Sequence, residues 1–197
     1  MKTSKILSIL TVLSIVVMAM LVVVACKKDD DGDDNNTPPA PENPLVGTYA
    51  FISATFNQPI TVIVNGDTNN YQAGDDAYIF VGGGLLGAAP CDNADNAALQ
   101  LRNDFTSWYV CQGEANESQQ GTWAPKVNNT VLTLNISDPA DFVVNITDLV
   151  LTADKLTGII PQLPMPYDTS IPVGAPLPGG GINFQIASVS VEFFILD

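Results

Sequence analysis

The sequence predicts an all-β fold for residues 45–197, as one antiparallel β-barrel or, alternatively, a β-sandwich. Short runs rich in β-branched and aromatic residues recur along the chain, turn signals separate them, and one short helix is expected. The expected strands are residues 51–56, 60–64, 78–81, 107–110, 131–136, 142–151 and 182–196. The turn signals are Asn65-Gly66-Asp67, Gly74-Asp75-Asp76, Asn128-Asn129 and Asp138-Pro139.

The last expected strand carries a break in its alternation. Its apolar residues occupy every second position as far as Ile186 and resume in the other phase from Val189. A change of phase moves the apolar set to the opposite face of a strand, so a bulge or bend is expected near Ala187-Ser188.

Three segments are not plain strands. Residues 94–101 are the helix candidate, and residues 81–90 are apolar but rich in glycine. Residues 161–181 contain six prolines and four glycines, a long connection for a compact domain. The last two segments form either a functional rim or an insertion packed over a barrel end.

The N-terminus resembles a bacterial lipoprotein signal peptide, cleaved after residue 25. Lys2 and Lys5 precede an apolar run over residues 6–24, and Ala25-Cys26 follows it. In lipoproteins the cysteine at this position is lipidated, so Cys26 is the expected anchor. The alternative is that the run is retained as a membrane-spanning helix, for which its length suffices.

Residues 26–44 predict a disordered tether after the lipid. From Lys27 onward they contain six acidic residues and four prolines, and too little apolar surface to fold. Lys28, Asp29 and Asp30 resemble the export signal of Bacteroidota surface lipoproteins. That resemblance implies a location on the outer face of the outer membrane.

Composition excludes several functions. The chain has 21 acidic residues, all after Lys28, and seven basic ones, of which Lys2 and Lys5 belong to the leader. Such an acidic chain repels phosphates, so no nucleic-acid partner is expected. It also contains no histidine, which rules out Ser-His-Asp and Cys-His catalysis.

Cys91 and Cys111 remain once Cys26 is lipidated, and they predict a disulfide in an exported domain. The alternatives are two buried thiols or a metal pair lacking further ligands. If bonded, their Cα atoms should lie about 4.4–6.8 Å apart.

Other motifs are weaker. Gly82, Gly84 and Gly87 fit the G-x-G-x-x-G pattern, but no helix is expected to start there, so the match is accidental. Acidic and amide residues cluster at 65–70, 75–76 and 92–96. They could bind calcium, or a carboxylate pair could hydrolyse glycans, but solvated turns explain them equally well.

The order of several short motifs resembles the lipocalin-like domains of Bacteroidota lipoproteins. The matching segments are Leu45-Val46-Gly47-Thr48-Tyr49, Cys91-Asp92, Asp95, Phe105, Trp108, Cys111, Gly121-Thr122-Trp123 and Val131-Leu132-Thr133-Leu134. The resemblance covers most of residues 45–157 and implies a calyx-like barrel of eight to ten strands. Tyr49 stands where that family has tryptophan, and Arg102 is the sole arginine, whereas lipocalins stack one from the last strand over that tryptophan.

These features together favour a non-enzymatic lipoprotein at the cell surface, held in the outer membrane by fatty acids on Cys26. It is expected to bind a small apolar ligand, a glycan or a protein partner, with no catalytic residue, metal or cofactor besides the lipid. Phe51, Phe105 or Trp108 would line a small-molecule pocket. The alternatives are a carboxylate-only hydrolase acting on glycans and an accessory subunit of an envelope complex.

Overall fold

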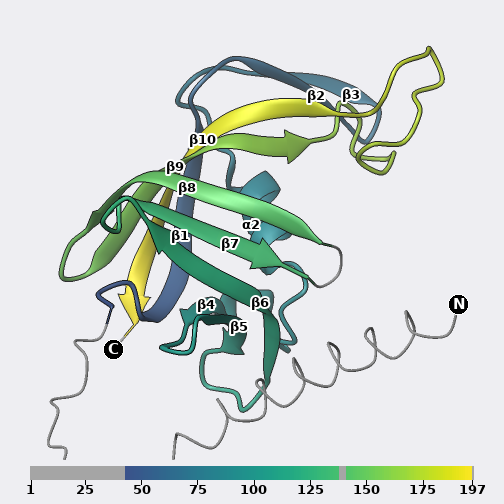
Figure 1. Ribbon diagram of the computed structural model, residues 1–197. Helices are drawn as coiled ribbons and strands as arrows, with labels where there is room; N and C mark the ends of the chain where they lie inside the picture. Colours follow the sequence, from purple (N-terminus) through teal and green to yellow (C-terminus); the bar gives the residue numbers. More distant parts are fainter. Residues whose placement is uncertain (1–42, 138–140, 197) are drawn as a thin grey trace, which may run out of the picture. The chain divides into compact units, whose positions relative to one another are not determined.

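The computed structural model describes residues 43–137 and 141–196, and eight of their strands form a closed antiparallel barrel (Figure 1). Around the ring the strands follow the order β1-β10-β9-β8-β7-β6-β5-β4, and pairing of β1 with β4 closes it. Strands β2 and β3 form a separate two-stranded sheet. The predicted all-β class is therefore confirmed, as a barrel rather than a sandwich.

The strands and helices have the following bounds. The barrel strands are β1 (Gly47–Phe56), β4 (Ala97–Leu101), β5 (Thr106–Cys111), β6 (Glu117–Lys126), β7 (Val131–Ile136), β8 (Phe142–Leu151), β9 (Lys155–Met165) and β10 (Gln185–Leu196). The hairpin strands are β2 (Ile60–Val64) and β3 (Asp67–Tyr71). The helical segments are α2 (Tyr78–Leu86) and the 3₁₀ helix η1 (Ala94–Asn96).

The core fills the inside of the ring, because alternate residues of each strand point inward. In β10, Val189, Val191 and Phe193 are buried while their neighbours are partly exposed. The pairing of β10 with β9 shifts register between Ala187 and Val189. The bulge expected from the break in alternation is thereby confirmed.

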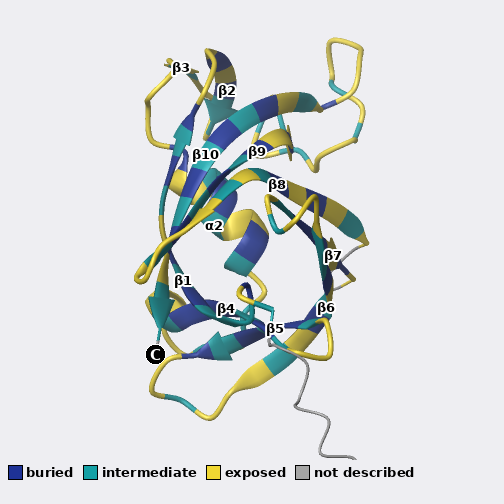
Figure 2. Cartoon of the chain, turned by 60° about the vertical axis from the view of Figure 1, so that its left-hand side comes forward, coloured by how far each residue is buried: buried dark blue, intermediate teal, exposed yellow. Residues whose placement is uncertain are grey.

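Residues 78–81 were expected to form a strand, and this prediction is wrong: they begin helix α2, which lies inside the ring of strands (Figure 2). Tyr78, Val81 and Leu85 share one helix face. Val81 and Leu85 are buried, and the ring of Tyr78 stacks on Phe51 with centroids 4.9 Å apart. Packing of this face against the barrel overrides the strand preference of the local sequence.

The helix predicted over residues 94–101 is also wrong beyond its first turn. Only η1 is helical, with the side chain of Asn93 accepting a hydrogen bond from Asp95 N. From Ala97 the chain becomes β4, which pairs with β1 on one side and β5 on the other. Closing the barrel requires a strand here, and that outweighs the weak helical preference of the segment.

The Pro- and Gly-rich connection begins with strand, since β9 runs to Met165. The segment that follows is organised by Asn183, whose side chain is fully buried. Its Nδ2 donates to the carbonyl oxygens of Asp168 and Ile171, at 2.9 and 2.7 Å, and its Oδ1 accepts from Asp168 N. Backbone hydrogen bonds to Ile63 join the segment to β2, so it is an ordered extension of the fold.

The predicted disulfide is confirmed. Cys91 and Cys111 are bonded, with their Cα atoms 5.3 Å apart, inside the expected range. The bond fixes the segment after α2 to the last residue of β5. Nearby, Glu114 accepts hydrogen bonds from Asp92 N and Asn96 Nδ2, which lower the pKa of its carboxyl group.

Tyr49 is a buried core residue of β1. It stands where the lipocalin-like domains that the sequence resembles have tryptophan. Its hydroxyl donates to the carbonyl oxygen of Leu45 at 2.8 Å. Burial disfavours the charged phenolate and raises the pKa of Tyr49 to about 12.

Stability should therefore fall as the pH rises from 10 toward 12. Unfolded Tyr49 ionises near 10.0, whereas the folded residue keeps its proton up to about 12, so in this interval deprotonation favours the unfolded chain. A shift of two units corresponds to about 3 kcal/mol. Urea unfolding at pH 9 and pH 12 measures this loss of unfolding free energy. Tyr49→Phe should lose this part of the pH dependence, while the exposed control Tyr167→Phe should keep it. Equal slopes for both variants would contradict the assignment.

Candidate functional site

The predicted anchor and export residues cannot be placed. Cys26, Lys28, Asp29 and Asp30 lie outside the described residues, as does the apolar run 6–24. Within the described part of the chain, no helix is long and apolar enough to cross a bilayer.

The acidic and amide clusters are used in turns. Asp75 Oδ2 accepts from Gln72 N, Asp76 Oδ1 accepts from Tyr78 N, and Asn93 caps η1. Among residues 43–137 and 141–196, no group of three or more Cys, Asp or Glu side chains is arranged to hold a metal ion. The turn contacts of Asp75, Asp76 and Asn93 agree with the solvated-turn interpretation of the clusters at 75–76 and 92–96.

The G-x-G-x-x-G match lies in a helix, although none was expected there. Its first two glycines, Gly82 and Gly84, lie in the middle of α2, and Gly87 follows the last turn. A dinucleotide's pyrophosphate needs glycines at the start of a helix, where the free N–H groups are. The interpretation of this motif as accidental therefore agrees with the structure.

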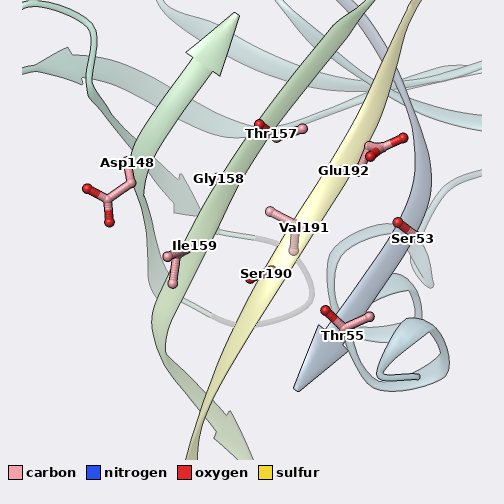
Figure 3. Close-up of a pocket in the computed structure, with 9 residues that line it drawn as sticks. All are labelled: Ser53, Thr55, Asp148, Thr157, Gly158, Ile159, Ser190, Val191 and Glu192. Atoms are coloured by element: carbon pink, nitrogen blue, oxygen red, sulfur yellow. The ribbon is translucent and has the colours of Figure 1, made fainter. Parts of the chain in front are cut away.

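A polar groove of about 320 Å³ crosses the outside of strands β1, β10, β9 and β8 (Figure 3). Hydroxyl side chains from three of these strands, Ser53, Thr55, Thr157 and Ser190, line it. Its two carboxylates, Asp148 and Glu192, point away from one another in Figure 3, and Glu192 is ion-paired with Lys155 at 2.8 Å. The groove does not bring two acids together on one bond, and no aromatic ring lines it for stacking on a sugar.

The barrel interior is nearly filled, and one small cavity lies beneath α2. Its volume is about 10 Å³, close to that of a single water position. Leu85 and Leu86 of α2 form one wall, and inward residues of five barrel strands form the rest. These are Leu99, Ser107, Tyr109, Gln120, Leu134, Ile136 and Phe193.

Two side-chain oxygens of this lining have no hydrogen-bond partner among the protein atoms described: Ser107 Oγ and Gln120 Oε1. Both residues are only 1% exposed. An unpaired buried polar group costs roughly 1–3 kcal/mol, so the folded protein carries a cost that a bound polar group would remove.

A β-bulge places Gln120 inside the barrel. The pairing of β5 with β6 shifts register between Ser107 and Trp108, and Gln120 is the extra residue. The next residue, Gly121, has φ +159°, and a Cβ there would lie 1.9 Å from the carbonyl oxygen of Asn135. Only glycine fits, so the bulge that turns Gln120 inward depends on Gly121.

The rest of the described interior carries no formal charge. Its buried polar residues are Ser107 and Gln120, and the buried aromatic residue Tyr109 adds a hydroxyl group to the cavity lining. The other two buried polar residues lie elsewhere: Thr133 points outward from β7, between the inward-facing Leu132 and Leu134, and Asn183 belongs to the segment after β9. Arg102 lies outside, its guanidinium 3.9 Å over the ring of Trp108 and paired with Glu117. The site beneath α2 is thus a mainly apolar cavity without buried charge, in which Ser107 Oγ and Gln120 Oε1 are the two unpartnered polar atoms.

The aromatic residues proposed for a pocket do not form one. Phe51 packs between Tyr78 and Phe193, Phe105 is half exposed, and Trp108 faces outward under Arg102. The polar pair was missed because Ser107 and Gln120 resemble ordinary outward-facing strand residues. The sequence signal was Gly121, a glycine inside a run of strand-forming residues.

Removing the Ser107 hydroxyl should not destabilise the protein, since it has no protein partner to lose. Ser107→Ala should leave the free energy of unfolding unchanged or raise it. Thr133→Val is the matched control, because Thr133 Oγ1 donates to Asn145 Oδ1 at 2.8 Å, and it should cost about 1 kcal/mol. Urea denaturation compares them, and an equal loss in both variants would contradict the unpaired state of Ser107.

The chain matches no protein-family model, no curated protein and no solved structure.

Proposed function

We propose that this protein is a lipid-anchored, non-catalytic carrier at the cell surface that holds a small apolar molecule inside its barrel. The unpaired Ser107 Oγ and Gln120 Oε1 carry the proposal, because two buried polar groups in an apolar cavity are the usual make-up of a ligand site. The motif order that resembles lipocalin-like domains supports the same function. The diverging carboxylates of the outer groove give a hydrolase no support.

A ligand larger than water needs more room than about 10 Å³, and α2 is the element that can provide it. Glycines occupy three consecutive positions of this nine-residue helix, 82–84, and each costs about 1 kcal/mol relative to alanine. Its N-cap, Ala77, makes no side-chain hydrogen bond, and neither its first nor its last turn carries a charge that favours the helix dipole, although Asp76 Oδ1 accepts from Tyr78 N at 2.8 Å. The helix is therefore held by the hydrogen bond from Tyr78 N to Asp76 and by the packing of Tyr78, Val81 and Leu85.

The disulfide limits how far this segment can move. Cys91 lies five residues after the end of α2 and is bonded to β5. Unwinding of α2 would free Leu85 and Leu86 from the cavity while the chain beyond them stays attached to the barrel. Opening is thus a local event rather than unfolding of the domain.

The proposed location rests on the leader, Cys26 and the acidic residues after it. If Cys26 is the acylated residue, a fatty-acid analogue fed to cells should label the wild-type chain and not Cys26→Ser. Cys91→Ser with Cys111→Ser is the control and should still be labelled. Equal labelling of Cys26→Ser and wild type would contradict the anchor.

Strengthening α2 should hinder ligand uptake. At Gly83 and Gly84 an added Cβ meets no atom within 4 Å, so alanine fits both positions and stabilises the helix by roughly 1–2 kcal/mol in total. If binding requires α2 to unwind, the apparent affinity for 1-decanol should fall about ten-fold. The measurement is hydrogen exchange of β5 and β6 in the full chain, reconstituted in phospholipid nanodiscs and titrated with 1-decanol.

Gly179→Ala is the matched control, since its added Cβ also meets open space but lies outside α2. It should leave the 1-decanol titration unchanged. Unaltered affinity in Gly83→Ala/Gly84→Ala would show that a ligand does not enter by unwinding α2.

A further inference from the structure

We infer that the head group of the ligand is neutral and both donates and accepts hydrogen bonds, as an alcohol or a primary amide does, and that it lies between Ser107 Oγ and Gln120 Oε1. This inference rests on the proposed function and adds the chemical class of the ligand. It is carried by the hydrogen-bonding capacity left open at these two atoms and by the absence of buried charge in the described interior.

The two side chains leave two hydrogen-bonding atoms without a partner among the described protein atoms. One of them can only accept a hydrogen bond, and the other can donate or accept one. Gln120 Nε2 donates to Ser118 Oγ at 2.7 Å, so Oε1 remains as a free acceptor. The Ser107 hydroxyl can donate or accept. A ligand hydroxyl placed between them donates its proton to Gln120 Oε1 and accepts the proton of Ser107, which satisfies both protein groups at once.

A charged head group fits this pair poorly. A carboxylate can only accept, so its negative oxygens would face the acceptor of Gln120. No lysine or arginine is buried in the described interior to balance it: Arg102 and Lys155 are paired with glutamates on the outer surface, and Lys126 is exposed. An ammonium group would likewise lack a buried carboxylate. An unbalanced charge in an apolar cavity is strongly disfavoured.

The remaining lining is suited to the rest of an amphiphile. The rest of the lining consists of Leu85, Leu86, Leu99, Tyr109, Leu134, Ile136 and Phe193, whose side chains are hydrophobic apart from the Tyr109 hydroxyl. With α2 in place the cavity accepts one water, which has the donor and acceptor groups of an alcohol. A long-chain alcohol would put its hydroxyl in the same position and its chain where the α2 leucines pack.

The test compares 1-decanol with decanoate on the full chain in nanodiscs at pH 7.5, with each concentration corrected for partitioning into protein-free nanodiscs. Hydrogen exchange of β5 and β6 reports occupancy. Half-maximal protection is expected at a concentration of 1-decanol at least ten-fold below that of decanoate. At pH 4.5, near the ordinary carboxyl pKa of roughly 4–5, decanoate gains a proton and the difference should narrow.

Ser107→Ala combined with Gln120→Met removes both polar groups and should abolish the ten-fold preference for the alcohol. Thr133→Val removes a buried hydroxyl that already has a protein partner, and this variant should retain the ten-fold preference for the alcohol. Equal binding of alcohol and carboxylate, or a preference that survives in the double variant, would overturn the inference but leave the proposed function standing. Protection by neither compound would overturn both, and would assign the cavity to water alone.

Discussion

The pairing of β1 with both β4 and β10 closes the barrel, and closure fixes the volume available to the interior side chains. Residues Gly47–Ala50 pair with β4, and from Thr48 to Phe56 the strand pairs with β10. A closed barrel of eight strands has an interior that side chains almost fill. A helix that enters this interior needs a small residue at the point where it comes closest to a strand. Gly82 meets this requirement, since a Cβ there would approach the Phe51 ring to 3.2 Å.

The same constraint explains why the polar pair is exceptional. Buried polar side chains elsewhere in the described chain have protein partners, as Thr133 on the outer face of β7 and Asn183 in the extension show. Ser107 Oγ and Gln120 Oε1 have none among the described atoms, although a bulge that only Gly121 permits places Gln120 inside. A structural feature that adds an unpaired group to the core is better explained by binding than by stability.

The sequence predicted those features that depend on local pattern. Runs of β-branched and aromatic residues identified β1, β2, β5, β7, β8 and β10, and a break in alternation identified the bulge at Ala187-Ser188. The pairing of Cys91 with Cys111 followed from the expectation that Cys26 is lipidated and the domain exported. The sequence-based prediction was wrong at α2 and β4 and did not include β3, β6 and β9, where the local preference is weak and strand pairing decides the outcome. The polar pair could not be predicted, because it depends on which way a bulge turns one glutamine.

The connection between the tether and the barrel has a mechanical consequence. Asn43 contacts the β6–β7 turn through Asn129, and the chain enters β1 a few residues later. If the protein is anchored through Cys26, a force that pulls along β1 loads its hydrogen bonds to β4 and β10 together. Hydrogen bonds loaded side by side in this way must break at once rather than one by one. Under such a force the barrel strands should separate only at a high force. The Asn183-centred extension should come apart at a much lower one.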